Sequence, residues 1–178
     1  MPPGAASGGI SDVSDDQGAA LAKPRVYLET TVVSYLTAES SRDLIQAAHQ
    51  HITREWWAKR RSDLDLFISQ VVINEVSEGD PGAAQRRLET IRGLPILDLT
   101  EGISELAQAL VAKGPLPEKA ADDAFHLAFA TVHDMDYLVT WNCKHLANAE
   151  MLRQVERLLD EKGYGIPRVC TPEELMGE

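Results

Sequence analysis

The segment RVYLETTVVSYL, residues 25–36, contains the change of local pattern that decides the fold. Its first part, RVYLE at 25–29, carries residue types that favour a short β-strand. Thr30 and Thr31 follow, and their hydroxyl groups suit the start of a helix. The apolar run VVSYL then continues as a helical turn. A strand that passes directly into a helix is the repeating step of an α/β domain.

The same step recurs along the rest of the chain. Further strands are predicted at 65–69, 94–99, 136–140 and 167–171. Helical spacing of apolar residues, with start and stop signals, marks 41–61, the run QVVINEVSEG after the second strand, 82–91, 101–112, 117–134, 144–162 and a short final TPEEL helix. This alternation predicts one α/β domain with a mainly parallel central sheet.

The amino-acid composition excludes several classes of protein. The 178 residues carry 17 basic and 28 acidic side chains, a net charge of −11, and the sequence pI is about 4.9. Apolar residues make up 44%, enough for a core, which excludes disorder of the whole chain. There is no run of 18 apolar residues, so we expect no membrane span. A strongly basic nucleic-acid-binding surface is also excluded, and contact with RNA would need local basic patches or bridging cations.

The first two dozen residues differ from the rest, because they are rich in Gly, Ala, Ser and Asp. They lack the basic start and apolar centre of a signal peptide. We expect a flexible tail at 1–24 and a single domain at 25–178. Cys143 and Cys170 form no C-x-x-C pair, so we expect both to be small buried apolar residues. Sparse cysteine use favours a cytoplasmic protein.

Several polar side chains follow strands at what should be one edge of the sheet. Glu29 ends the first predicted strand, Glu75 lies on the helix after the second, and Asn142 follows the fourth. Asp122 and Asp123 lie early in a long helix. Open parallel sheets bind ligands outside the carboxyl ends of their strands. We therefore expect these groups to converge there.

The two aspartates cannot face one point equally, because a helix turns by about 100° per residue. A core-facing stripe with helical period decides between them, and it consists of Ala120, Ala124, Leu127, Ala128 and Thr131. Asp123 borders this stripe. We predict that Asp123 points inward, with Asp122 as the alternative.

Carboxylates brought this close need a partner. Two of them about 4 Å apart repel by about 4 kcal/mol at an effective dielectric constant near 20. Such a cluster is stable only with proton uptake or a cation, and oxygen ligands select hard ions such as Mg²⁺ or Mn²⁺. The residues alone predict an acid-lined metal site and no particular reaction.

Four stretches of the chain resemble, in order and spacing, the signatures of PIN-domain ribonucleases, many of which are VapC-type toxins of type II toxin–antitoxin modules. They are YLETTVVSYL, SQVVINEV, DAFHLAFA and YLVTWNCKHL, and the resemblance runs from Val26 to Arg168. It implies a three-layer α/β/α PIN-like fold and a Mg²⁺- or Mn²⁺-dependent endoribonuclease that hydrolyses RNA phosphodiester bonds. It also implies a homodimer and a small antitoxin partner.

Carried over one by one, the acidic positions of the family fall on Glu29, Glu75, Asp123 and Asn142, with the first three as metal ligands. This chain has Glu29 and Asn142 where the family usually has aspartate. Asn142 keeps an oxygen but removes a negative charge, which should weaken metal affinity. The two departures make a catalytically silent PIN-like binding or scaffold domain the alternative function.

Neighbouring residues complete the hypothesis. Thr30 and Thr140 match hydroxyl positions that, in similar sites, often hold a metal-bound water. His126 lies one turn from Asp123 and could donate a hydrogen bond to a ligating carboxylate, and His145 could touch the same site. Each histidine could equally have a purely structural role. Candidates for contact with RNA are Lys144, Arg60, Arg61 and the ring of Trp141, which otherwise packs in the core.

A third class of protein fits less well. A phospho-receiver needs paired acids after its first strand, and a haloacid-dehalogenase-type phosphatase needs D-x-D-x-T there. The first strand here ends in Glu29, Thr30 and Thr31, which match neither pattern.

Overall fold

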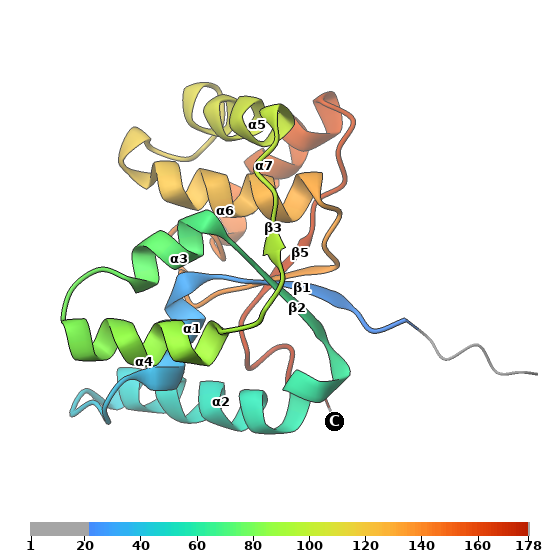
Figure 1. Ribbon diagram of the computed structural model, residues 1–178. Coiled ribbons are helices and arrows are strands. Elements are labelled where there is room, and N and C mark those ends of the chain that lie inside the picture. Colours follow the sequence, from blue (N-terminus) through green and yellow to red (C-terminus); the bar gives the residue numbers. More distant parts are fainter. Residues whose placement is uncertain (1–21, 178) are drawn as a thin grey trace, which may run out of the picture.

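A five-stranded parallel sheet forms the centre of the computed structural model, which describes residues 22–177 (Figure 1). Most of the expected tail, residues 1–21, and the last residue lie outside the described part. The strand order is β3-β2-β1-β4-β5, and every neighbouring pair is parallel. The strands are β1 (Arg25–Leu28), β2 (Asp65–Ser69), β3 (Ile96–Leu97), β4 (Tyr137–Val139) and β5 (Arg168–Cys170). The predicted parallel sheet is confirmed.

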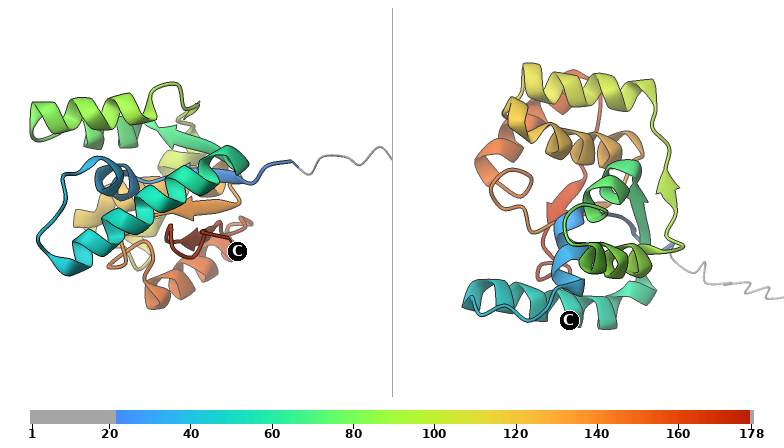
Figure 2. Two further views of the ribbon diagram at one scale, coloured as in Figure 1. Left: turned by 90° about the horizontal axis from the view of Figure 1, so that it is seen from below. Right: turned by 60° about the vertical axis from the view of Figure 1, so that its left-hand side comes forward.

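Helices cover both faces of the sheet. The links from β1 to β3 contain α1 (Thr30–Thr37), α2 (Leu44–Arg60), the short turn η1 (Arg61–Asp63), α3 (Gln70–Val76) and α4 (Pro81–Ile91). The links from β3 to β5 contain α5 (Glu101–Ala112), the short turn η2 (Glu118–Ala120), α6 (Ala121–Val132) and α7 (Ala149–Glu161). In Figure 1, α1, α2 and α4 lie below the strands and α5, α6 and α7 above them. The right-hand view of Figure 2 again shows α5 and α6 at the opposite end from α2. These are the three layers of an α/β/α fold.

The layers bury all of the central strand β1 except its first residue, Arg25, which is partly exposed. Val26, Tyr27 and Leu28 of β1 have no exposed surface, as expected for a parallel strand that is covered on both faces. β1 pairs with β2 through Tyr27 and Phe67, and with β4 through Leu28 and Val139. None of the helices within residues 22–177 is both long and apolar enough to cross a membrane.

Several boundaries differ from the sequence prediction. The helix expected from residue 117 begins at Ala121, because Ala120, the last residue of the short turn η2, leaves helical geometry (φ −108°, ψ 34°). The strand expected at 94–99 is only Ile96–Leu97; Pro95 before it has no N–H to give to a ladder. The helix expected from residue 144 begins at Ala149, where Asn148 provides the cap. The TPEEL segment forms a turn rather than a helix, with the Glu174 carboxylate accepting the Thr171 N–H at 2.8 Å.

The topology creates a crevice at the centre of the sheet. β1 and β4 are neighbours, yet the chain leaves β1 toward β2 and leaves β4 toward β5. Such a switch point separates the helices that follow the two strands, and ligands of open α/β sheets bind there. Glu29 follows β1 and Thr140 follows β4, so both lie at this crevice.

Candidate functional site

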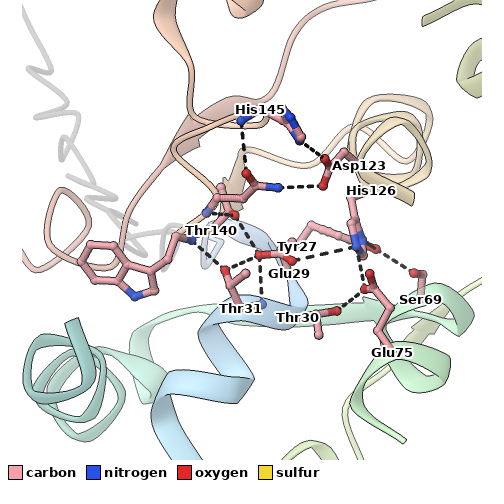
Figure 3. Close-up of polar contacts among 12 residues, drawn as sticks. Tyr27, Glu29, Thr30, Thr31, Ser69, Glu75, Asp123, His126, Thr140 and His145 are labelled. Carbon is pink, nitrogen blue, oxygen red and sulfur yellow. Dashed lines mark hydrogen bonds and ion pairs between the residues drawn. The ribbon is translucent and has the colours of Figure 1, made fainter. Parts of the chain in front are cut away.

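A cavity of about 360 Å³ lies at the switch point. We call it the site cavity, and it is lined by Glu29, Thr30, Thr31, Ser34, Tyr35, Glu75, Asp123 and Asn142. The four positions predicted as catalytic therefore come together, although they belong to four different parts of the chain. Figure 3 shows three of them, Glu29, Glu75 and Asp123.

Glu29 is a fixed, buried carboxylate at the start of α1. Its backbone N–H donates to the Val139 carbonyl at 3.1 Å, which ties it to β4. Its Oε2 accepts the Thr31 N–H at 3.0 Å, the Thr140 hydroxyl at 2.8 Å and the Thr31 hydroxyl. Only 3% of Glu29 is exposed, and this burial raises its pKa, although the hydrogen bonds and the nearby His126 oppose the rise. The other oxygen, Oε1, faces His126 at 4.0 Å.

Glu75, on α3, is bound to His126. Its Oε2 lies 2.9 Å from His126 Nε2 and accepts the Thr30 hydroxyl. Desolvation alone would raise the pKa of Glu75, but the hydrogen bond and charge of His126, together with Thr30, outweigh it and lower the pKa. Desolvation likewise opposes protonation of His126, but the neighbouring Glu75 and Glu29 raise its pKa. The two glutamates thus share one basic partner.

A buried series of hydrogen bonds holds the side of the His126 ring that faces away from the glutamates. His126 is 1% exposed, and its Nδ1 lies 2.9 Å from the Tyr27 hydroxyl. The same hydroxyl lies 2.7 Å from Ser69 Oγ. Burial and the nearby glutamates raise the pKa of Tyr27, so this hydroxyl stays neutral. Sequence reasoning missed Tyr27 and Ser69, because no motif marks a residue that points into the site from inside a strand or at its end.

Asp123, Asn142 and His145 form a second polar group in the site. Asn142 Oδ1 accepts the His145 backbone N–H at 3.1 Å, which fixes the orientation of the amide because a backbone N–H can only donate. Asn142 Nδ2 therefore donates to Asp123 Oδ1 at 2.8 Å, and Asp123 Oδ2 lies 2.7 Å from His145 Nδ1. The oxygen that Asn142 keeps at this position is thus engaged by the backbone.

The choice between the two aspartates is settled by the helical face. Asp123 is partly buried and lines the site cavity, whereas Asp122 is exposed. The stripe that favoured this orientation is buried at every position, Ala120, Ala124, Leu127, Ala128 and Thr131. The prediction that Asp123 points inward is confirmed.

Two other expectations need correction or refinement. Cys143 is exposed, because it lies in the irregular segment after β4, whereas Cys170 at the end of β5 is buried as predicted. Trp141 packs rather than standing free: its Nε1 donates to the Thr53 hydroxyl at 2.8 Å and its ring stacks on His49 at 4.0 Å. The packing interpretation of Trp141 is the one that the structure supports.

The basic residues expected to contact RNA lie at two different edges of the sheet. Arg60 and Arg61 end α2 and directly precede β2, so they lie at the amino edge, away from the site cavity. There Arg60 pairs with Asp63 at 3.3 Å, and Arg61 covers the ring of Trp57. These two arginines are therefore not placed to contact RNA inside the site cavity, and RNA contact elsewhere on the surface stays a prediction. Lys144 follows Asn142 on the site's own edge and is exposed.

The donor set of the site fits a divalent cation. One ligand atom each from Glu29, Glu75 and His126 lie within 4.8 Å of one another. Asp123 is not part of this group but lines the same cavity. Carboxylate oxygens are ligands for Mg²⁺, Ca²⁺ and Mn²⁺, and imidazole nitrogen binds the transition metals. Residues to hold a cation are therefore present.

Comparisons with known proteins point to the fold alone. No model of a known protein family matches the chain, and no curated protein sequence matches it. A chain in the crystal structure of VapBC2 from Rickettsia felis, bound to a DNA fragment from their promoter, superposes with a TM-score of 0.54 at 17% sequence identity. The match covers 83% of this chain and 98% of that one. The chain described here therefore has a PIN-like α/β/α fold.

Proposed function

We propose that this chain is a divalent-metal-dependent endoribonuclease, a VapC-like toxin that hydrolyses RNA phosphodiester bonds. The observation that carries the proposal is the convergence of Glu29, Glu75 and Asp123 on one cavity at the switch point of the sheet. The PIN-like fold supports it, together with the resemblance of the sequence around these residues to PIN-domain ribonucleases.

Each residue of the site has a distinct part in the proposed reaction. Glu29, Glu75 and Asp123 would hold one or two Mg²⁺ or Mn²⁺ ions. A bound cation of this kind lowers the pKa of its water and neutralises charge that grows on the phosphate. Thr140 fixes Glu29 through its hydroxyl, and Asn142 fixes Asp123 through its amide, so the carboxylates are positioned before the substrate arrives.

The electrostatics of the chain make the cation necessary for binding as well as for chemistry. The chain carries a net charge of −11, and three of its carboxylates line the cavity where a phosphate would lie. Like charges in a partly buried site repel strongly. A divalent cation held by these carboxylates offsets two of the three negative charges and would give the RNA phosphate a positive centre to bind.

One observation favours a second candidate, a silent PIN-like binding domain. Both oxygens of Asp123 already have partners, Asn142 and His145, so this carboxylate is satisfied without a metal. A silent domain would keep the cavity and its hydrogen bonds but leave RNA uncut.

The fold likeness also motivates a proposal about assembly. The Rickettsia felis structure is a VapBC2 complex on promoter DNA. We propose by analogy that this chain is a homodimer in the cytoplasm and is bound by a small antitoxin protein. We also propose that residues 1–24 form a tail and 25–178 the domain.

The test is cleavage of a defined single-stranded RNA by the purified chain. With Mg²⁺ or Mn²⁺ we expect internal cuts, and EDTA should abolish them. Asp123→Asn should remove nearly all cleavage, whereas the matched control Asp122→Asn, one residue away and exposed, should retain it. Cleavage that survives exhaustive chelation would contradict the metal mechanism, and metal binding without any cleavage would favour the silent domain.

A further inference from the structure

We propose that His126 Nε2 binds the cation directly, together with Glu29 and Glu75, and that this nitrogen makes the centre selective for Mn²⁺ over Mg²⁺. The inference rests on the proposed function, since it concerns the cation that the nuclease would hold. It gives His126 direct coordination in place of the supporting hydrogen bond that the sequence suggested.

The position of His126 suits a ligand of the same ion as both glutamates. Its Nε2 lies 2.9 Å from Glu75 Oε2 and 4.0 Å from Glu29 Oε1. With octahedral bonds of about 2.1 Å, adjacent ligand atoms lie about 3.0 Å apart and opposite ones about 4.2 Å apart. The first distance matches an adjacent pair and the second approaches an opposite pair. Small shifts of the side chains would bring all three atoms onto one ion.

The groups that hold His126 Nδ1 would let Nε2 bind a cation, which would replace the hydrogen bond between Nε2 and Glu75 Oε2. The Tyr27 hydroxyl can accept a hydrogen bond from His126 Nδ1–H and donate its own proton to Ser69 Oγ, at the observed distances of 2.9 and 2.7 Å. In that tautomer the lone pair of Nε2 points toward the glutamates. Metal-binding histidines ordinarily donate their other ring N–H to an oxygen acceptor in this way. Because His126 is 1% exposed, its ring is held in this orientation.

The second histidine of the site lacks this arrangement. His145 is less buried than His126, with 15% of its side chain exposed, and its Nδ1 contacts Asp123 Oδ2 at 2.7 Å. It therefore faces the other polar group of the cavity. His145 is the natural control for any effect of His126.

A nitrogen ligand changes which ion the site prefers. Mg²⁺ is hard and is held by oxygen ligands and water, whereas imidazole suits first-row transition metals. The two glutamates keep enough oxygen for Mn²⁺. We therefore expect Mn²⁺ to bind about tenfold or more tightly than Mg²⁺.

Pulsed electron paramagnetic resonance of Mn²⁺ bound to the full-length chain tests the assignment. The spectrum should contain a nitrogen coupling that changes when the protein is grown with ¹⁵N-histidine. His126→Asn should abolish this coupling, because asparagine can still reach Tyr27 but has no atom at the place of Nε2. His145→Asn should leave it intact. His126→Asn should also weaken Mn²⁺ binding about tenfold or more, and Mg²⁺ binding less.

The outcomes separate this inference from the proposed nuclease. Bound Mn²⁺ without histidine nitrogen coupling overturns the inference, and metal-dependent RNA cleavage in the same sample would leave the nuclease standing. Coupling from His126 without cleavage supports the inference and contradicts the nuclease. Failure of Mn²⁺ to bind overturns both. If His126→Asn does not fold, the labelled parent and His145→Asn still decide, because loss of coupling in His145→Asn would overturn the assignment.

Discussion

Replacing Asn142 by aspartate converts the contact that holds Asp123 into a repulsion, and its size can be worked out from the structure. The amide nitrogen lies 2.8 Å from Asp123 Oδ1. Two carboxylate oxygens at that distance repel by about 6 kcal/mol at an effective dielectric constant near 20. Uptake of one proton relieves this repulsion. For an aspartic acid of ordinary pKa, this protonation costs about 4 kcal/mol at pH 7 and about 1.5 kcal/mol at pH 5.

Because protonation costs less than the repulsion, the folded state should take up one proton. Asn142→Asp should therefore lose up to about 4 kcal/mol of unfolding free energy at pH 7 without metal, and about 1.5 kcal/mol at pH 5. The new group binds its proton more tightly when folded than when unfolded, so the loss grows as pH rises. Urea unfolding in EDTA at the two pH values measures it. Saturating Mn²⁺ should recover part of the loss, since each tenfold gain in affinity adds about 1.4 kcal/mol.

The matched control is Asn148→Asp. Asn148 caps α7 by accepting the Glu150 and Met151 N–H groups, and aspartate caps a helix equally well. We expect a change within about 0.5 kcal/mol, independent of pH. An equal loss in both variants, or a loss in Asn142→Asp that does not vary with pH, would refute the contact between Asn142 and Asp123.

Three further predictions test other parts of the molecule. Tyr27→Phe should cost about 1–3 kcal/mol in urea unfolding, because it leaves the buried polar atoms of Ser69 and His126 without a partner. The control Tyr137→Phe on β4 should change stability little. Equal effects would contradict the buried hydrogen bonds of Tyr27. At pH 8 a thiol reagent should modify Cys143 rapidly and Cys170 only after denaturation, since burial raises the pKa of Cys170 to about 12; two fast thiols would contradict the burial at the end of β5. Removal of residues 1–21, which contain few large apolar side chains, should leave the melting temperature unchanged, and a drop of several degrees would show that they contribute to stability.

The sequence was sufficient for the architecture and for the convergence of the acidic positions because both depend on local rules. Alternation of strands and helices predicts a parallel sheet, and the carboxyl ends of its strands share one edge. The orientation of Asp123 followed from the apolar period of its helix. The bonding of Asn142 could not follow, because it depends on a backbone N–H three residues away in an irregular segment.

The buried support of His126 was equally inaccessible from the sequence. Tyr27 lies within the first strand and Ser69 ends the second, and both look like ordinary core or boundary residues. Only the pairing of β1 with β2 and the packing of α6 bring them to His126. Arg60 and Arg61 show the converse, since their charge suggested RNA contact while their place before β2 puts them at the opposite edge.

The most direct test of a metal-dependent nuclease at this site is to compare occupancy with activity in one titration. Mn²⁺ is added to the metal-free chain, its binding is followed by electron paramagnetic resonance, and cleavage of a labelled single-stranded RNA is measured in the same buffer. We predict that the cleavage rate and the occupancy rise together with the same half-saturation, and that Glu29→Gln weakens both, because Glu29 lies in the group of potential ligands. Cleavage that is already maximal before Mn²⁺ binds, or that is unaffected by Glu29→Gln, would contradict the account.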